Sequence, residues 1–126
     1  MAKDASLLIS RILVVFIFLH AGIDKIRHWS DTIAYMQHYN VPLIKFSLAA
    51  AIIIEVVGAF LIILGLKSRY AAVLLMIYLV VITAFFHNII KEPQQMINFL
   101  KNIAILGSLL SIAIHGHGKF GFDKEQ

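Results

Sequence analysis

The chain has 126 residues, of which 60% are apolar and 14% charged, whereas soluble domains are roughly half apolar and a quarter charged. Its net charge of +4 and pI near 9.5 come from lysines and arginines at the ends of apolar runs, a placement typical of membrane-flanking charge rather than of nucleic-acid binding. The absence of cysteine excludes dithiol redox chemistry, thiolate metal sites and disulfides for the chain acting alone. We therefore expect one all-α integral membrane domain over residues 1–126, built as a four-helix up-and-down bundle in the lipid bilayer.

The first predicted span covers about residues 7–23. Lys3 precedes its apolar run, as in a secretory signal, but no small-residue cleavage pattern follows and the run contains Arg11 and His20. We therefore expect a retained transmembrane helix rather than a signal peptide.

The polar residues of this span divide between two faces of the predicted helix. At 100° per residue, Arg11 and Lys25 fall on one side, and His20 and Asp24 on the opposite side. His20 and Asp24, four residues apart, could offer two ligands to a metal, but no three-ligand spacing appears among the six histidines. A haem bundle needs facing histidines that this sequence does not specify, so we expect neither metal nor haem.

A connecting segment at about residues 29–41 follows the first span. Trp29, Ile33 and Met36 recur there at helical spacing, and Pro42 closes the segment. This pattern predicts a short amphipathic helix in the headgroup layer, anchored by its tryptophan. An irregular loop is the alternative.

The second predicted span, residues 46–66, carries Glu55 as its single charge. Ala51, Gly58 and Gly65 recur every seven residues along nearly the same stripe, so Glu55 lies on the face with the least side-chain bulk, where another helix can approach closely. A charge in hydrocarbon costs at least a few kcal/mol, and such residues usually face the bundle interior and mark function. We expect Glu55 to point inward.

Two partners are open to Glu55. Arg11 lies in the same half of the bilayer under an up-and-down topology, but the two positions differ by roughly 10 Å in depth at 1.5 Å per residue, which two extended side chains only just bridge. Otherwise Glu55, without a counter-charge, is expected to be protonated, and Tyr78, at similar depth on the third span, could take the hydrogen bond.

The third and fourth spans are predicted at about residues 70–90 and 96–114. Only Lys67 and Ser68 separate the second span from Arg69, so the second and third helices must be antiparallel neighbours. Lys91, Glu92 and Pro93 interrupt the helix between the third and fourth spans, because proline cannot continue it. In lipid these uninterrupted apolar runs must be helices, because barrel strands would alternate polar and apolar residues.

A polar cluster is predicted at one end of the bundle, above the buried Glu55. It draws on Lys25 from the first span, His87 from the third, and Lys101 and Asn102 from the fourth. Such a cluster could receive an anionic or quinone-like head group. The alternative is ordinary snorkelling of both lysines, with His87 capping a helix end.

The numbers of lysines and arginines on the two sides of the membrane are nearly equal, with six on the side of the termini and five on the other, so the total count does not decide the orientation. Short loops weigh most in the positive-inside rule, so Lys67 and Arg69 favour cytoplasmic termini.

Several fragments together resemble the DoxX family of small four-helix bacterial membrane proteins. They are RILVVFIFLHAGIDKI, EVVGAFLIILGLKSRYAA, FFHN and FLKNIAILGSLLSIAIHGHGKFGFD. The resemblance implies that the family's polar and glycine positions fall at Arg11, Gly22, Lys25, Glu55, Gly58, Gly65, Arg69, His87, Lys101, Asn102, Gly107, Gly116 and Gly118. Gly121 departs from the serine usual near the last aspartate, so Asp123 is the one match in that turn.

The resemblance implies a plasma-membrane protein, linked in some relatives to quinol oxidase or other redox systems. The first hypothesis is an accessory or ligand-binding subunit that holds a quinone or lipid beside a membrane redox partner. One alternative is a small quinone-linked oxidoreductase in which Glu55 or His87 moves protons, although no catalytic constellation is recognisable. A transporter or channel subunit is less favoured, since no inverted repeat appears and a homo-oligomer would be needed to enclose a path.

Overall fold

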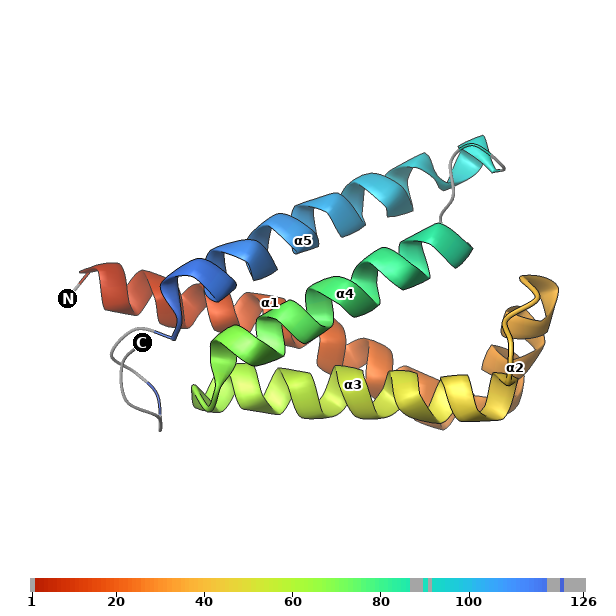
Figure 1. The fold of residues 1–126 in the computed structure, drawn as a ribbon, viewed down its shortest axis with the longest axis horizontal. Coiled ribbons are helices and arrows are strands. Elements are labelled where there is room, and N and C mark those ends of the chain that lie inside the picture. Colours follow the sequence, from red (N-terminus) through yellow and green to blue (C-terminus); the bar gives the residue numbers. More distant parts are fainter. Residues whose placement is uncertain (1, 87–89, 91, 118–120, 122–126) are drawn as a thin grey trace.

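A computed structural model describes residues 2–86, 90, 92–117 and 121, and these residues form helices and turns without strands. The elements in chain order are α1 (Ala2–Arg27), α2 (Trp29–His38), α3 (Ile44–Leu64), α4 (Ser68–Phe86), the short 3₁₀ helix η1 (Pro93–Gln95) and α5 (Met96–His115). Figure 1 shows the four long helices and, at one end, the short α2. The all-α class is confirmed.

Four helices of the described chain are long and apolar enough to cross a membrane: α1, α3, α4, and α5 together with η1. Within a helix every central N–H and C=O is paired, which is what a bilayer requires of the backbone. The predicted four-helix membrane bundle is therefore confirmed. The first helix is longer than the predicted span of residues 7–23, since it also includes the charged residues on both sides of the apolar run.

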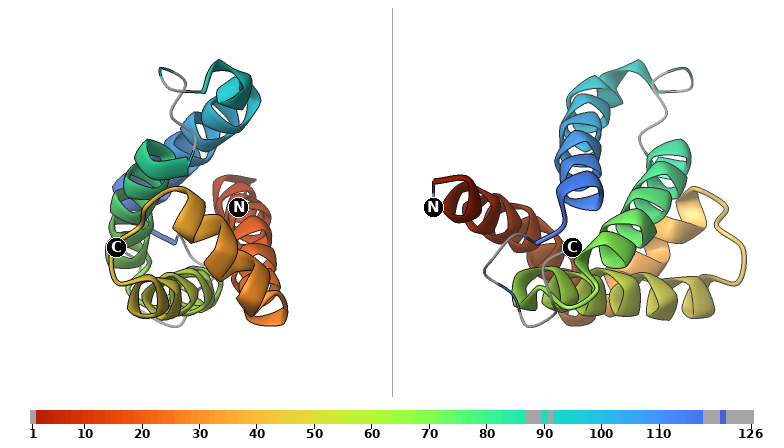
Figure 2. Two further views of the ribbon diagram at one scale, coloured as in Figure 1. Left: turned by 90° about the vertical axis from the view of Figure 1, so that its right-hand side faces the viewer. Right: turned by 60° about the vertical axis from the view of Figure 1, so that its left-hand side comes forward.

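The bundle is made of helix pairs. α1 packs along α3, α3 along α4, and α4 along α5, whereas α1 and α5 have less contact. The start of α1, the α3–α4 turn and the end of α5 lie at one end of the molecule, and α2 lies at the other (Figures 1 and 2). Consecutive long helices thus run up and down, as predicted.

The core lies mainly between α1, α3 and α4. It includes Phe18, Ala59, Ile62 and Leu75, all nearly or fully excluded from the surface. Large apolar side chains also cover the outside, among them Phe16. This outward apolar surface fits a protein whose solvent is lipid.

The α2 helix confirms the short helix predicted over residues 29–41 and joins the first span to the second. Its Met36 is buried, and the ring of Tyr35 stacks on Phe86 at the end of α4, with centroids 5.2 Å apart. Just beyond α2, Tyr39 donates a hydrogen bond to the Glu92 carboxylate over 3.2 Å. These contacts hold α2 against the ends of the third and fourth spans.

Candidate functional site

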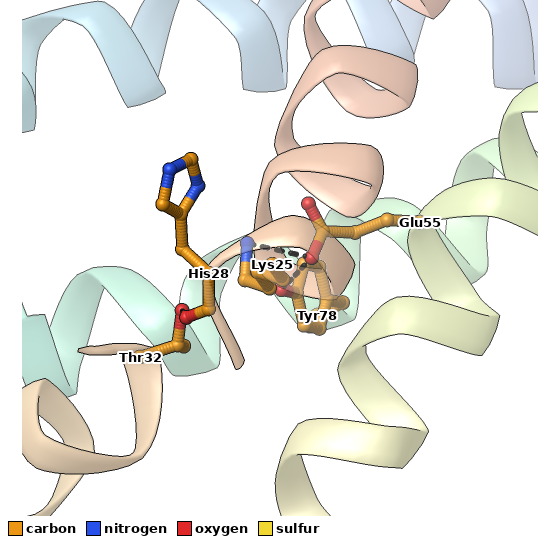
Figure 3. Close-up of polar contacts among 5 residues, drawn as sticks. All are labelled: Lys25, His28, Thr32, Glu55 and Tyr78. Atoms are coloured by element: carbon orange, nitrogen blue, oxygen red, sulfur yellow. Dashed lines mark hydrogen bonds and ion pairs between the residues drawn. The ribbon is translucent and has the colours of Figure 1, made fainter. Parts of the chain in front are cut away.

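Glu55, near the middle of α3, is the hub of a buried polar cluster. Its side chain is 2% exposed, and its Oε1 lies 2.8 Å from Nζ of Lys25 on α1. The hydroxyl of Tyr78 on α4 donates to the same oxygen over 2.8 Å. Figure 3 shows the three side chains converging from three helices. We call Lys25, Glu55 and Tyr78 the Glu55 cluster.

Gly22 allows α1 to approach α3 where the cluster forms. A Cβ built on Gly22 would lie 2.7 Å from Val56 Cγ2 and 3.5 Å from Glu55 Cβ. A larger residue would push the helices apart. Lys25 lies three residues further along α1, and helical side chains lean towards the N-terminus, which directs its ammonium back to Glu55.

We expect Gly22→Val to lower the free energy of unfolding by about 1–3 kcal/mol, the usual cost of overpacking, and to separate Lys25 from Glu55. Thermal unfolding in a mild detergent measures the loss. The matched control is Gly107→Ala on α5, where an added Cβ meets nothing within 4 Å. That variant should keep its stability or gain up to about 1 kcal/mol from helix propensity. Equal stability of the two variants would contradict the close approach.

Gly58 plays the corresponding part between α3 and α4. A Cβ there would meet the Leu75 side chain at 3.1–3.2 Å, so α4 packs closely against α3 at this level. Tyr78 lies one helical turn beyond Leu75. Its hydroxyl can therefore reach Glu55 without leaving the helix interface.

A cavity of about 440 Å³ lies beside the cluster, between α2, α3 and α4. Lys25 and Tyr78 both line it, and Lys25 is the one charged residue among the described lining residues. Most of its wall is apolar, formed by Met36, Val41, Pro42, Phe46, Leu48, Ala50, Ala51, Ile54, Val81, Ile82, Phe85 and Phe86, with Thr32, Tyr35 and Ser47 as further polar residues. A mostly apolar cavity of this size with a few convergent polar groups is typical of a small-molecule site. We call it the Glu55 cavity.

Arg11 lies at the opposite end of the α1–α3 interface. Its guanidinium is fully buried and donates through Nη1 to the carbonyls of Ile62 at 2.9 Å and Ile63 at 3.3 Å. The last turn of a helix leaves carbonyls without helical N–H partners, and in a membrane they need other donors. The Ile62 carbonyl also accepts from the N–H of Gly65 over 3.1 Å, so Arg11 adds a second donor there and supplies one to Ile63.

Gly65 makes room for this contact. It caps α3 in the left-handed conformation with φ of 68°. A Cβ there would lie 3.1 Å from Arg11 Nη1, 3.2 Å from the buried ring of His117 and 2.5 Å from the Cα of Gly121. Glycine is thus required both by the backbone angle and by the space.

Comparison with known proteins identifies the family. The DoxX family model matches residues 6–88. The chain belongs to the DoxX family. It is 34% identical to the inner membrane protein YphA of Escherichia coli strain K12, over 98% of this chain and 91% of YphA. It is 31% identical to the inner membrane protein YqjF of the same organism, over 97% of this chain and 92% of YqjF. No solved structure matches the chain.

The partner of Glu55 in this DoxX protein is Lys25 rather than Arg11. The carbonyls that Arg11 contacts lie seven and eight residues beyond Glu55, or roughly 11 Å further along α3 at 1.5 Å per residue. The pairing of Arg11 with Glu55 considered from the sequence is therefore wrong. Tyr78 does contact Glu55, as the alternative had it, but its hydroxyl donates to the Glu55 carboxyl, and Glu55 has Lys25 beside it rather than no counter-charge.

The predicted end cluster is divided in the structure. Lys25 turns to Glu55, while Asn102 on α5 is 6% exposed and donates to Thr83 Oγ1 on α4 over 3.0 Å. Lys101 is exposed, as expected for a snorkelling lysine. His87 lies outside the described residues. The division arises because Lys25 and Asn102 belong to different helix interfaces.

Thr83 and Asn102 line a second cavity of about 510 Å³ between α4 and α5. Thr83 donates in turn to the carbonyl of Leu79 over 2.7 Å, so Thr83 and Asn102 already form hydrogen bonds within the protein. The Glu55 cavity, which carries a charged donor, is the stronger candidate for ligand binding.

His20 and Asp24, the weak metal candidates, both point outward on α1. Asp24 Oδ1 lies 3.1 Å from Nδ1 of His28, a side chain that is itself half exposed. Among the described residues no group of three histidine, cysteine or acidic side chains could hold a metal ion.

The part of the site that sequence reasoning missed is the wall contributed by α2. Thr32, Tyr35 and Met36 line the Glu55 cavity. The helical spacing of Met36 with Trp29 and Ile33 predicts an apolar helix face, but such a face indicates contact with a membrane surface as readily as with a cavity. The feature of the sequence that points to the cavity wall is this apolar face together with the buried Glu55 on the following span.

Proposed function

We propose that this DoxX protein is a ligand-binding accessory subunit of the inner membrane, which holds a quinone or lipid in the Glu55 cavity beside a redox partner of the quinol-oxidase type. The observation that carries the proposal is the apolar cavity of about 440 Å³ lined by Lys25 and Tyr78, next to the buried Glu55. An ionisable pair at this depth is costly, and residues of this kind in membrane helices usually serve function.

The lining of the cavity suits a head group joined to an apolar tail, because it combines one lysine with mostly apolar walls. Lys25 offers N–H donors, and its side chain is 26% exposed although it contacts Glu55. Phe46 and Phe85 line the cavity and are also exposed on the outer surface, at 73% and 41%. An apolar tail could therefore pass between them towards the bilayer.

The proposed location is the bacterial inner membrane, with both termini in the cytoplasm. Two relatives described as inner membrane proteins support the location. The short basic turn that contains Lys67 and Arg69 supports the orientation, because positive charge in short loops favours the cytoplasmic side.

Gentle purification followed by mass spectrometry of bound lipids, quinones and proteins tests both halves of the proposal. Ala51→Phe adds a ring to the cavity wall and should reduce the co-purifying ligand several-fold while the protein still folds. Ile53→Phe is the matched control, since Ile53 lies on the same helix, is 60% exposed and does not line the cavity. It should retain the ligand.

Three results would count against the proposal. If the purified wild-type protein carries no more quinone or lipid than the bulk membrane does, the ligand-binding role is contradicted. Equal ligand content in Ala51→Phe and Ile53→Phe would place the ligand elsewhere. The absence of any redox protein among the co-purified partners would remove the accessory role.

A further inference from the structure

We infer that the Glu55 cavity selects a neutral head group that presents a carbonyl oxygen, and that Glu55 is the residue that excludes anions. The inference rests on the proposed ligand-binding function and narrows its ligand class. Lys25 alone would attract carboxylates, phosphates and sulfonates. Its contact with Glu55 changes which head groups fit.

The Lys25–Glu55 pair carries no net charge. Lys25 Nζ and Glu55 Oε1 are 2.8 Å apart, so the positive charge of the ammonium is balanced by the carboxylate. No other charged side chain is found among the described residues that line the cavity. An incoming anion would therefore find no net positive charge.

An anion in the cavity would lie beside the Glu55 carboxyl. A head group that contacts Lys25 from the cavity lies within a few ångströms of the Glu55 carboxyl, because that carboxyl is bonded to the same ammonium. The surrounding wall is mostly apolar, which strengthens the interaction between charges compared with water. A second anion beside Glu55 would be repelled and would also lose its hydration.

Lys25 keeps hydrogen-bond donors for a ligand. An ammonium has three N–H donors, and the contact with Glu55 uses one of them. The hydroxyl of Tyr78 is already directed to Glu55. The hydroxyls of Thr32 and Ser47 donate to the carbonyls of His28 and Pro42. The cavity thus offers hydrogen-bond donation from a neutralised lysine, together with the neutral hydroxyl of Tyr35, which suits a ketone, quinone or ester carbonyl.

The carbonyl could come from two sources, a quinone ring or the ester of an uncharged glyceride. Both join a neutral acceptor to an apolar tail, and both fit a cavity that combines a lysine with mostly apolar walls. Binding of a decyl-substituted benzoquinone and of a diacylglycerol, measured separately, distinguishes the two sources.

The test compares matched probes on protein in phosphatidylcholine nanodiscs, with empty nanodiscs as the correction for partition. The probes are a long-chain methyl ketone and an alkyl sulfonate of the same chain length, which remains ionised. Wild-type protein should bind the ketone at least about tenfold more tightly than the sulfonate. Glu55→Gln should bind the sulfonate at least about tenfold more tightly than wild type does, because its Lys25 charge is no longer neutralised.

Glu92→Gln is the matched control, because it removes the same charge outside the membrane span and leaves an oxygen that can accept the Tyr39 hydrogen bond. It should keep the wild-type selectivity. Wild-type binding of ketone and sulfonate within twofold of each other would overturn the inference and leave the proposed function standing. Binding of no neutral or anionic probe would overturn both. A folded Glu55→Gln that binds the sulfonate no better than wild type does would overturn the role given to Glu55.

Discussion

Replacing Lys25 with methionine is expected to lower the free energy of unfolding by about 3 kcal/mol, the usual cost of removing one partner from a buried ion pair. For a chain of this size that corresponds to a fall of roughly 10 °C in Tm. The loss arises because Glu55, 2% exposed, would keep Tyr78 as a hydrogen-bond partner but lose its counter-charge. Thermal unfolding in a mild detergent measures it.

Two further variants separate the ion pair from the loss of a long side chain. Lys101→Met removes an exposed lysine from α5 and should change Tm little. Adding Glu55→Gln to Lys25→Met should recover much of the lost stability, since no unpaired charge remains. A Lys25→Met variant as stable as Lys101→Met would show that the pair is not formed.

Replacing Arg11 with methionine is expected to lower the free energy of unfolding by about 3 kcal/mol, because a hydrogen bond from a charged donor contributes about 1.5–3 kcal/mol and Arg11 serves two carbonyls. Methionine preserves much of the apolar packing but offers no donor to Ile62 and Ile63. Ile62 would keep the N–H of Gly65, but the end of α3 would lose the charged side-chain donor that both carbonyls share inside the membrane. Chemical and thermal unfolding in detergent measure the loss.

Arg27→Met supplies the control, because Arg27 is exposed in the last turn of the same helix. Its replacement should cost little. Arg11→Lys should fall between the two, since lysine keeps the charge but loses the fixed fork of donors. If Arg11→Met and Arg27→Met are equally mild, the capping role of Arg11 is contradicted.

The four spans and the inward direction of Glu55 could be predicted from the sequence because both follow from the properties of the lipid bilayer that surrounds the protein. A bilayer obliges an apolar run to pair its own backbone, which makes each run a helix. The same bilayer makes an outward carboxylate costly, which turns Glu55 to the interior. Neither conclusion needs the positions of neighbouring helices.

The partner of Glu55 could not be read in this way. Counting residues gives the depth of Arg11 and Lys25 only if the register between helices is known, and that register depends on where side chains allow close approach. In the structure Gly22 lies against Val56, which brings Lys25 to Glu55 and leaves Arg11 at the end of α3. A shift of a few residues would have changed the pairing.

The cavity depends on packing that no single segment specifies. Its walls come from α2, α3 and α4, and its polar end combines Lys25 from α1 with Tyr78 from α4. Sequence reasoning placed Lys25 in a cluster with Asn102, because both lie at the same end of their helices. Whether two residues at the same end of the bundle are neighbours depends on which helices pack against each other, and that order is not given by any one segment.

The central claim is that Lys25 and Glu55 are in contact within the membrane. Solid-state NMR on protein in lipid bilayers, with nitrogen-labelled lysine and carbon-labelled glutamate side chains, measures the dipolar coupling between Lys25 Nζ and the Glu55 carboxyl carbon. The structure predicts a measurable coupling, because Oε1, which is bonded to that carbon, lies 2.8 Å from Nζ, and the coupling should disappear in Lys25→Met. A wild-type spectrum without that coupling would contradict the contact.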